Sequence, residues 1–190
     1  SEITIHVPTL HSVDSEKFDV EICMIHKMSG SGGSINGVIL SRMFQVGHHF
    51  GKPETFMNQF INDIPSEEID YDKEIIVSDE WSADLLIPER KSFYMYTGSL
   101  PFPPCTEQYK VFLYEDIGTI SKTNIDILKL NIGKNIRPVR PLNERVVFYK
   151  SKVESKNKAE RAVRESDNKY MKCRKLELTE KKIETKAPLK

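Results

Sequence analysis

The chain has 190 residues and no net formal charge, because 28 Lys and Arg residues balance 28 Asp and Glu residues. This length allows one domain with a real core plus an extension, and the neutral total gives no support for a specific nucleic-acid partner. The balance hides an asymmetry, since residues 150–190 carry 14 basic against 7 acidic residues. We therefore expect a domain at 1–149 and a basic docking tail, helical or disordered, at 150–190.

The cysteines and the hydropathy pattern argue against a disulfide-rich protein and against a membrane-spanning one. Cys23, Cys105 and Cys173 have unrelated spacings, so no disulfide framework can be derived from them, and a reducing compartment is favoured. There is no run of about 18 apolar residues, so we expect no membrane-spanning helix.

The first half of the chain predicts three strands followed by a helix. Alternating or β-branched residues predict strands at 2–7 and 18–27, and the segment 37–47 is apolar enough for a central strand. The Gly- and Ser-rich segment 29–34 is interpreted as a connecting loop, because no Lys-Ser or Lys-Thr pair follows to hold a phosphate. Phe56, Phe60 and Ile64 recur every four residues, which predicts a helix over 52–64.

The second half predicts an acidic solvated loop, further strands interrupted by prolines, and a short helix. The prolines in the segment 101–105 exclude a helix there and lack the backbone N–H groups that pair one strand with another. A Ser or Thr residue caps the start of the second helix. The expected elements are a loop at 65–74, strands at 93–100, 110–117 and 145–150, a helix at 121–130 and an extended loop at 135–143.

Three of these stretches occur in an order found in one family. They are YMYTGSLPFPPCTE at 94–107, VFLYEDIGTIS at 111–121 and NIRPVRPLNERVV at 135–147. Together they resemble the C-terminal half of an α-class carbonic anhydrase, whose return loop reads Asn-x-Arg-Pro-x-Gln-Pro-Leu-Asn. The resemblance covers residues 2–149. It implies a mainly β (α+β) fold, with part of a twisted, mostly antiparallel sheet, short flanking helices and a charged C-terminal extension.

The resemblance also identifies where that family holds its zinc ion. A catalytic zinc needs three imidazole, thiolate or carboxylate ligands and an open position for water. The three ligand positions correspond here to Thr4, His6 and Cys23, and a neutral hydroxyl is a poor zinc donor. His6 and Cys23 remain weak candidate ligands, and we expect no zinc cofactor. His26 points to the opposite face from Cys23 by strand alternation.

A second group of family residues also departs from the pattern. The threonine that directs the zinc-bound hydroxide corresponds to Pro101, and its glutamate acceptor corresponds to Leu10. The threonine that contacts bicarbonate corresponds to Phe102, which we expect to fill the substrate cone. With the ligand set and this relay both altered, the sequence predicts an inactive homologue with no catalytic residues.

The remaining matches are structural. Glu21 corresponds to the residue that orients a ligand histidine, His11 to a histidine that hydrogen-bonds behind the site, and Leu100 to a wall of the substrate pocket. The rigid return loop is matched by Asn135, Arg137, Pro138, Pro141, Leu142 and Asn143.

The family's domain begins with strands that are not in this sequence, and three explanations stay open: that part has been removed, it is left out of this chain, or another polypeptide supplies it and completes the sheet. Unpaired strand edges favour association, and Cys105 would lack its family partner. The favoured function is a non-catalytic, carbonic-anhydrase-like structural subunit of a larger protein assembly, in an intracellular compartment such as a mitochondrial or cytoskeletal one. The alternatives are a divergent zinc enzyme using His6 and Cys23, or a module that binds polyanions or carbohydrate.

Overall fold

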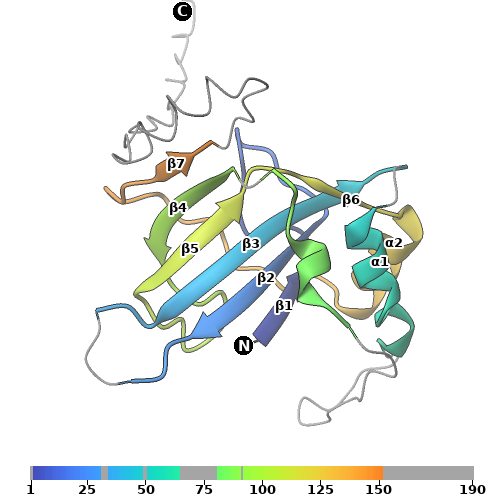
Figure 1. Cartoon of the computed structure of the whole chain (residues 1–190), viewed down its shortest axis with the longest axis horizontal. Coiled ribbons are helices and arrows are strands. Elements are labelled where there is room, and N and C mark those ends of the chain that lie inside the picture. Colours follow the sequence, from blue (N-terminus) through green and yellow to red (C-terminus); the bar gives the residue numbers. More distant parts are fainter. Residues whose placement is uncertain (1, 31–33, 49–50, 65–80, 91, 152–190) are drawn as a thin grey trace, which may run out of the picture.

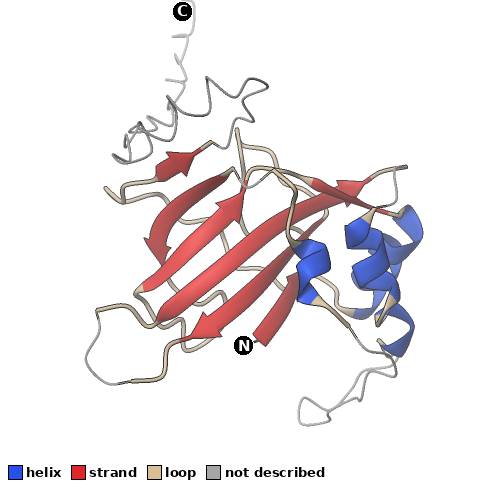
Figure 2. Ribbon diagram, viewed as in Figure 1, coloured by secondary structure: helices blue, strands red, loops and turns tan. Residues whose placement is uncertain are grey.

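The computed structural model describes residues 2–30, 34–48, 51–64, 81–90 and 92–151. Seven strands form one twisted sheet, and the helices gather near one end of it (Figures 1 and 2). The strands are β1 (Glu2–His6), β2 (Val20–Lys27), β3 (Gly37–Val46), β4 (Phe93–Gly98), β5 (Tyr109–Tyr114), β6 (Gly118–Ile120) and β7 (Phe148–Lys150). The helices are α1 (Lys52–Asn58) and α2 (Lys122–Asn131), with 3₁₀ turns η1 (Ile61–Asp63) and η2 (Ala83–Leu86).

The sheet has the order β1-β2-β3-β5-β4-β7, and β6 pairs with the end of β3. The β3–β5 and β3–β6 pairs are parallel and the other four are antiparallel. This mixed, mostly antiparallel sheet with short flanking helices confirms the predicted fold class.

Side-chain alternation along β2 divides the core into two layers. Val20, Ile22 and Met24 lie on the face that the helices cover, and Phe56 and Leu128 pack there with them. The residues between them in sequence, such as Cys23, lie on the opposite face. Because β2 is buried on both faces, it reads as a nearly continuous apolar run, as central strands do.

The two helices are joined by the carboxylate of Glu54. It accepts hydrogen bonds from the Ser121 backbone N–H (2.8 Å) and the Asn124 side-chain amide (2.9 Å). Ser121 in turn caps α2, since its hydroxyl oxygen accepts the Asn124 backbone N–H at 3.2 Å. This polar junction fixes the helical layer against one end of the sheet.

The first predicted helix is too long. Rather than spanning 52–64, α1 ends at Asn58, and Phe60 adopts a φ of −141° before the short turn η1 begins. The break lets Ile61, which is only 4% exposed, enter the core alongside Phe56. The three-residue strand β6 was not predicted, because its sequence is short and begins with Gly118.

Several predictions lie outside the described residues. They concern the acidic loop at 65–74, the centre of the Gly- and Ser-rich loop, and the tail beyond Ser151. Within the described part of the chain, no helix has the length and apolar character to cross a membrane.

Candidate functional site

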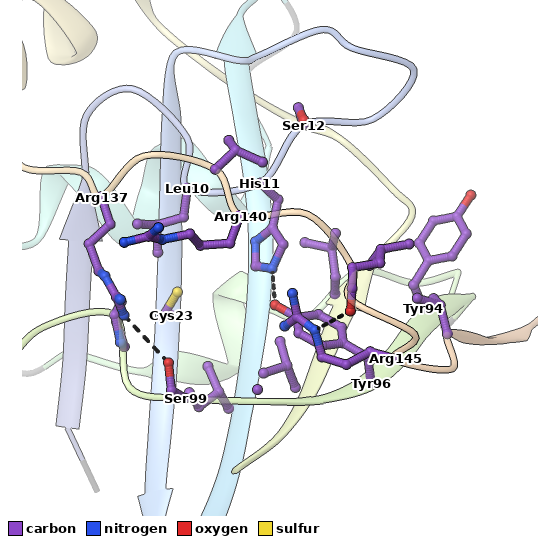
Figure 3. Close-up of a pocket in the computed structure, with 18 of the residues that line it drawn as sticks. Leu10, His11, Ser12, Cys23, Tyr94, Tyr96, Ser99, Arg137, Arg140 and Arg145 are labelled. Carbon is purple, nitrogen blue, oxygen red and sulfur yellow. Dashed lines mark hydrogen bonds between the residues drawn. The ribbon is translucent and has the colours of Figure 1, made fainter. Parts of the chain in front are cut away.

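A cavity of about 400 Å³ lies on the face of the sheet opposite the helices. Its floor is apolar and comes from strands β2, β3 and β5 and the turn after β4, through Cys23, Ile39, Val111, Leu113 and Leu100. Its rim includes residues from the connection after β1 and from the return loop 135–147 (Figure 3). Strand alternation explains the floor, because each of these strand residues follows a neighbour that faces the helices.

The sheet register brings the three ligand positions together on this face. Thr4 pairs directly with Cys23 across β1 and β2, and His6 pairs with Glu21. The His6 Nε2 atom lies 3.0 Å from the Thr4 hydroxyl oxygen, and its Nδ1 atom lies 3.4 Å from the Asn135 carbonyl oxygen. Since a carbonyl only accepts, Nδ1 carries the proton and the Nε2 lone pair accepts the Thr4 hydroxyl hydrogen. Burial lowers the pKa of His6, so its imidazole is neutral.

Cys23 is held as a thiol. Its sulfur lies 3.7 Å from a Glu21 carboxylate oxygen and 3.6 Å from the Ser41 hydroxyl oxygen, and the residue is 1% exposed. Burial and the neighbouring Glu21 charge raise the pKa of Cys23 well above its ordinary value. Zinc binds the thiolate form of cysteine, which this environment opposes.

These residues do not fit a catalytic zinc ion. The three positions offer a hydroxyl, one imidazole whose lone pair is engaged, and a buried thiol, whereas a catalytic site needs three nitrogen, thiolate or carboxylate ligands. Within the described ranges, no group of three His, Cys, Asp or Glu side chains is arranged to hold a metal. These residues therefore do not provide the ligand set that a zinc-bound hydroxide requires.

Behind the cavity floor, Glu21 forms a buried network. Its carboxylate accepts hydrogen bonds from the His11 backbone N–H (2.9 Å), the His11 Nδ1–H (2.6 Å) and the Ser41 hydroxyl (2.5 Å). Burial opposes ionisation of Glu21, but the charge and hydrogen bonds of His11 outweigh it and lower the pKa of Glu21 to about 2. On His11 itself burial opposes the charged form, yet the Glu21 carboxylate raises its pKa.

Tyr96 on β4 closes this network. Its hydroxyl lies 2.5 Å from His11 Nε2, and burial raises the pKa of Tyr96, so the phenol stays protonated. Sequence reasoning identified Glu21 and His11 but missed Ser41 and Tyr96. These come from β3 and β4, and their only sequence signal was an inward-facing polar residue on a predicted strand.

The positions that correspond to the family's relay are apolar here. Leu10 and Pro101 both line the cavity, and Pro101 offers neither a hydroxyl nor a backbone N–H. Phe102 is not among the lining residues. It packs against the apolar cluster that contains Leu100 and Tyr109, and other members of that cluster form the cavity floor.

The return loop holds the rim in place through backbone contacts. Asn135 accepts the Val7 backbone N–H at 2.8 Å and donates to the Ile5 carbonyl at 2.8 Å, which joins the loop to β1. Arg137 donates to the Leu100 carbonyl at 3.3 Å. The expected structural role of this loop agrees with these contacts.

The geometry places the protein in a known structural class. The α-carbonic anhydrase of Thermovibrio ammonificans, solved with the inhibitor sulfanilamide, superposes with a TM-score of 0.65 and 27% identity, over 76% of this chain and 60% of that one. A dioscorin solved in complex with ascorbate gives a TM-score of 0.66 and 26% identity, over 80% of this chain and 62% of that one. The sheet therefore has the α-carbonic anhydrase fold.

Sequence comparison gives the family. The model of the eukaryotic-type carbonic anhydrase matches residues 8–151, and the chain belongs to that family. Alpha carbonic anhydrase 3 of Arabidopsis thaliana is 30% identical over 151 residues, covering 75% of this chain and 50% of that protein. Dioscorin DB3L of Dioscorea polystachya is 27% identical over 165 residues, covering 83% and 56%. The chain thus spans about half the length of these curated relatives.

Proposed function

We propose that this chain is a non-catalytic member of the carbonic anhydrase family that serves as a structural subunit of a protein assembly. One observation carries the loss of catalysis: the three positions that would hold zinc form a hydrogen-bonded set instead of a ligand set. His6 accepts from Thr4, and Cys23 is a buried thiol beside the Glu21 carboxylate. When zinc is bound in this fold, it supplies a hydroxide near neutral pH, because it lowers the pKa of its water to about 7.

The residues around that position would not assist the reaction either. In the family that the sequence resembles, a threonine hydroxyl and a glutamate direct the nucleophile. Here Pro101 and Leu10 line the same cavity, and neither accepts or donates a side-chain proton. A metal that entered the site would therefore meet an apolar wall where the reaction needs a hydrogen-bond relay.

The end strand β1 supports the structural part of the proposal. Because Asn135 bonds to the Val7 N–H and the Ile5 carbonyl, those groups face away from β2, and Ile3 shares their orientation. β1 is the last strand in the sheet order of the described residues, so Asn135 covers only part of its outer edge. An exposed edge of this kind pairs readily with a further strand, which a partner in an assembly would supply under this proposal.

Metal analysis and a hydration assay test the catalytic half of the proposal. Purified protein incubated with zinc and dialysed should retain far less than one zinc per chain and should not accelerate carbon dioxide hydration above a buffer blank. One zinc per chain with hydration above that blank would refute the proposal and establish a divergent enzyme using His6 and Cys23.

A repaired variant provides the positive control. Thr4→His with Cys23→His restores three imidazoles on one face, so this double variant should bind zinc. Hydration should appear only when Pro101→Thr and Leu10→Glu are added. The structural half is tested by isolating the chain from its native source, where a stable stoichiometric protein complex is expected and a free monomer would contradict it.

A further inference from the structure

Three arginines of the return loop line the mouth of the cavity: Arg137, Arg140 and Arg145 (Figure 3). Arg137 donates only to neutral oxygens, at 3.4 Å to the Ser99 hydroxyl and 3.3 Å to the Leu100 carbonyl. The guanidinium of Arg145 donates to two backbone carbonyls of its own loop and lies over the Tyr96 ring. None of the three forms an ion pair with another described residue.

Arg140 is the least engaged of the three. It is exposed and makes no hydrogen bond or ion pair within the described part of the chain. Figure 3 shows its side chain extending from the loop in the direction of Arg137. Asp14 is the only carboxylate among the described lining residues, so the mouth keeps a net positive charge. A guanidinium stays charged at any physiological pH and binds a carboxylate through two parallel hydrogen bonds.

The floor beneath these charges is apolar. Ile39, Val111 and Leu113 are each at most 5% exposed and come from neighbouring strands, and Leu100 adds a further wall. A cavity of about 400 Å³ lies within the range of small-molecule sites, which are mostly apolar with a few polar groups that set orientation. A sugar would leave its hydroxyls unpaired against this floor, and unpaired buried polar groups cost binding energy.

From this arrangement we propose that the cavity binds a small organic acid, with an aromatic or short aliphatic body on the floor and a carboxylate held at the mouth by Arg140 and Arg137. The body buries apolar surface, and the carboxylate meets guanidinium donors that no described residue neutralises. The inference goes beyond the proposed function, because such a ligand could bind whether or not the chain has hydration activity. A failure of the ligand-binding experiment would therefore leave the proposed function untouched, and a failure of the metal analysis would leave the ligand proposal untouched.

Arg140→Gln is the informative variant. The side chain is exposed and without described contacts, so the fold should survive, and glutamine is the residue that the resembled family motif has at this position. Arg90→Gln is the matched control, since Arg90 is also an exposed arginine but does not line the cavity.

The test is isothermal titration calorimetry with 2-naphthoate and its neutral analogue 2-naphthamide, using the full chain at pH 7. We expect 2-naphthoate to bind with one site per chain and 2-naphthamide to bind at least fivefold more weakly. Arg140→Gln should weaken 2-naphthoate about five- to tenfold and leave 2-naphthamide unchanged, while Arg90→Gln should change neither. Equal affinities for the two probes, no binding of 2-naphthoate, or equal effects of the two variants would overturn the proposal.

Discussion

Replacing Glu21 with leucine tests the buried Glu21–His11 network. The substitution removes the acceptor for the His11 side chain, the His11 backbone N–H and the Ser41 hydroxyl, at 2.6, 2.9 and 2.5 Å. Removing one partner of a buried charged pair typically costs about 3–5 kcal/mol, because the other partner loses its compensation. For a chain of this size, that corresponds to a fall in the unfolding midpoint of about 6–20 °C.

The pH dependence makes this prediction specific. The lowered pKa of Glu21 contributes stability that is present above its unfolded value of about 4.5 and is lost as the pH falls towards about 2. The raised pKa of His11 contributes stability that is present below 6.5 and is lost as the pH rises through its folded value. The stability difference between wild type and Glu21→Leu should therefore be largest between about pH 4.5 and 6.5.

Differential scanning calorimetry from pH 3 to pH 9 measures that difference. Glu21→Gln is the matched control, since it keeps an acceptor oxygen of the same size but removes the charge, and its loss should be smaller and less dependent on pH. A Glu21→Leu protein as stable as wild type, or a stability difference that does not vary with pH, would refute the electrostatic reasoning.

Three further substitutions test the packing that positions the site. Gly118→Ala should cost about 1–3 kcal/mol in the free energy of unfolding, because the new Cβ would lie 2.4 Å from a Phe44 ring carbon, as urea denaturation would measure. Ser121→Ala should cost about 1 kcal/mol by removing the α2 cap, with a loss below about 0.3 kcal/mol counting against that role. Asn135→Ala should cost about 1–3 kcal/mol and speed hydrogen exchange at Val7, whereas unchanged exchange would show that the loop does not hold β1.

Much of the fold could be predicted because its strands carry local signals. The alternation in β1 places Thr4 and His6 on one face of the sheet. Cys23 joins them through the register of β1 with β2, a position that the sequence analysis took from the family resemblance. The end of α1 was predicted wrongly because a residue outside the helical spacing, Ile61, gains more from burial in the core than the helix gains from another turn.

The site was harder to predict than the fold, since its parts come from distant segments. No local pattern links Glu21 with Ser41, which reaches it through the register of β2 with β3, or with Tyr96, which joins the network through His11 because of the path of β4. Of the loop arginines only Arg137 was interpreted as structural, and it does donate to the Leu100 carbonyl, whereas Arg140 and Arg145 were not singled out. Their shared position at the cavity mouth depends on the loop's path, which prolines constrain but do not specify.

The Glu21 network gives the site a shape that does not depend on the residues at the three ligand positions. In the family that the sequence resembles, this glutamate orients a ligand histidine. Here Cys23 occupies the position of that histidine, and a thiol has no ring for the glutamate to orient. Here the same carboxylate holds Ser41 on β3 and His11, and His11 reaches Tyr96 on β4. These bonds join the cavity wall to its floor. Of the three ligand positions, Cys23 touches this carboxylate only through the weak thiol contact, so the proposed non-catalytic chain keeps the cavity and its arginine-lined mouth.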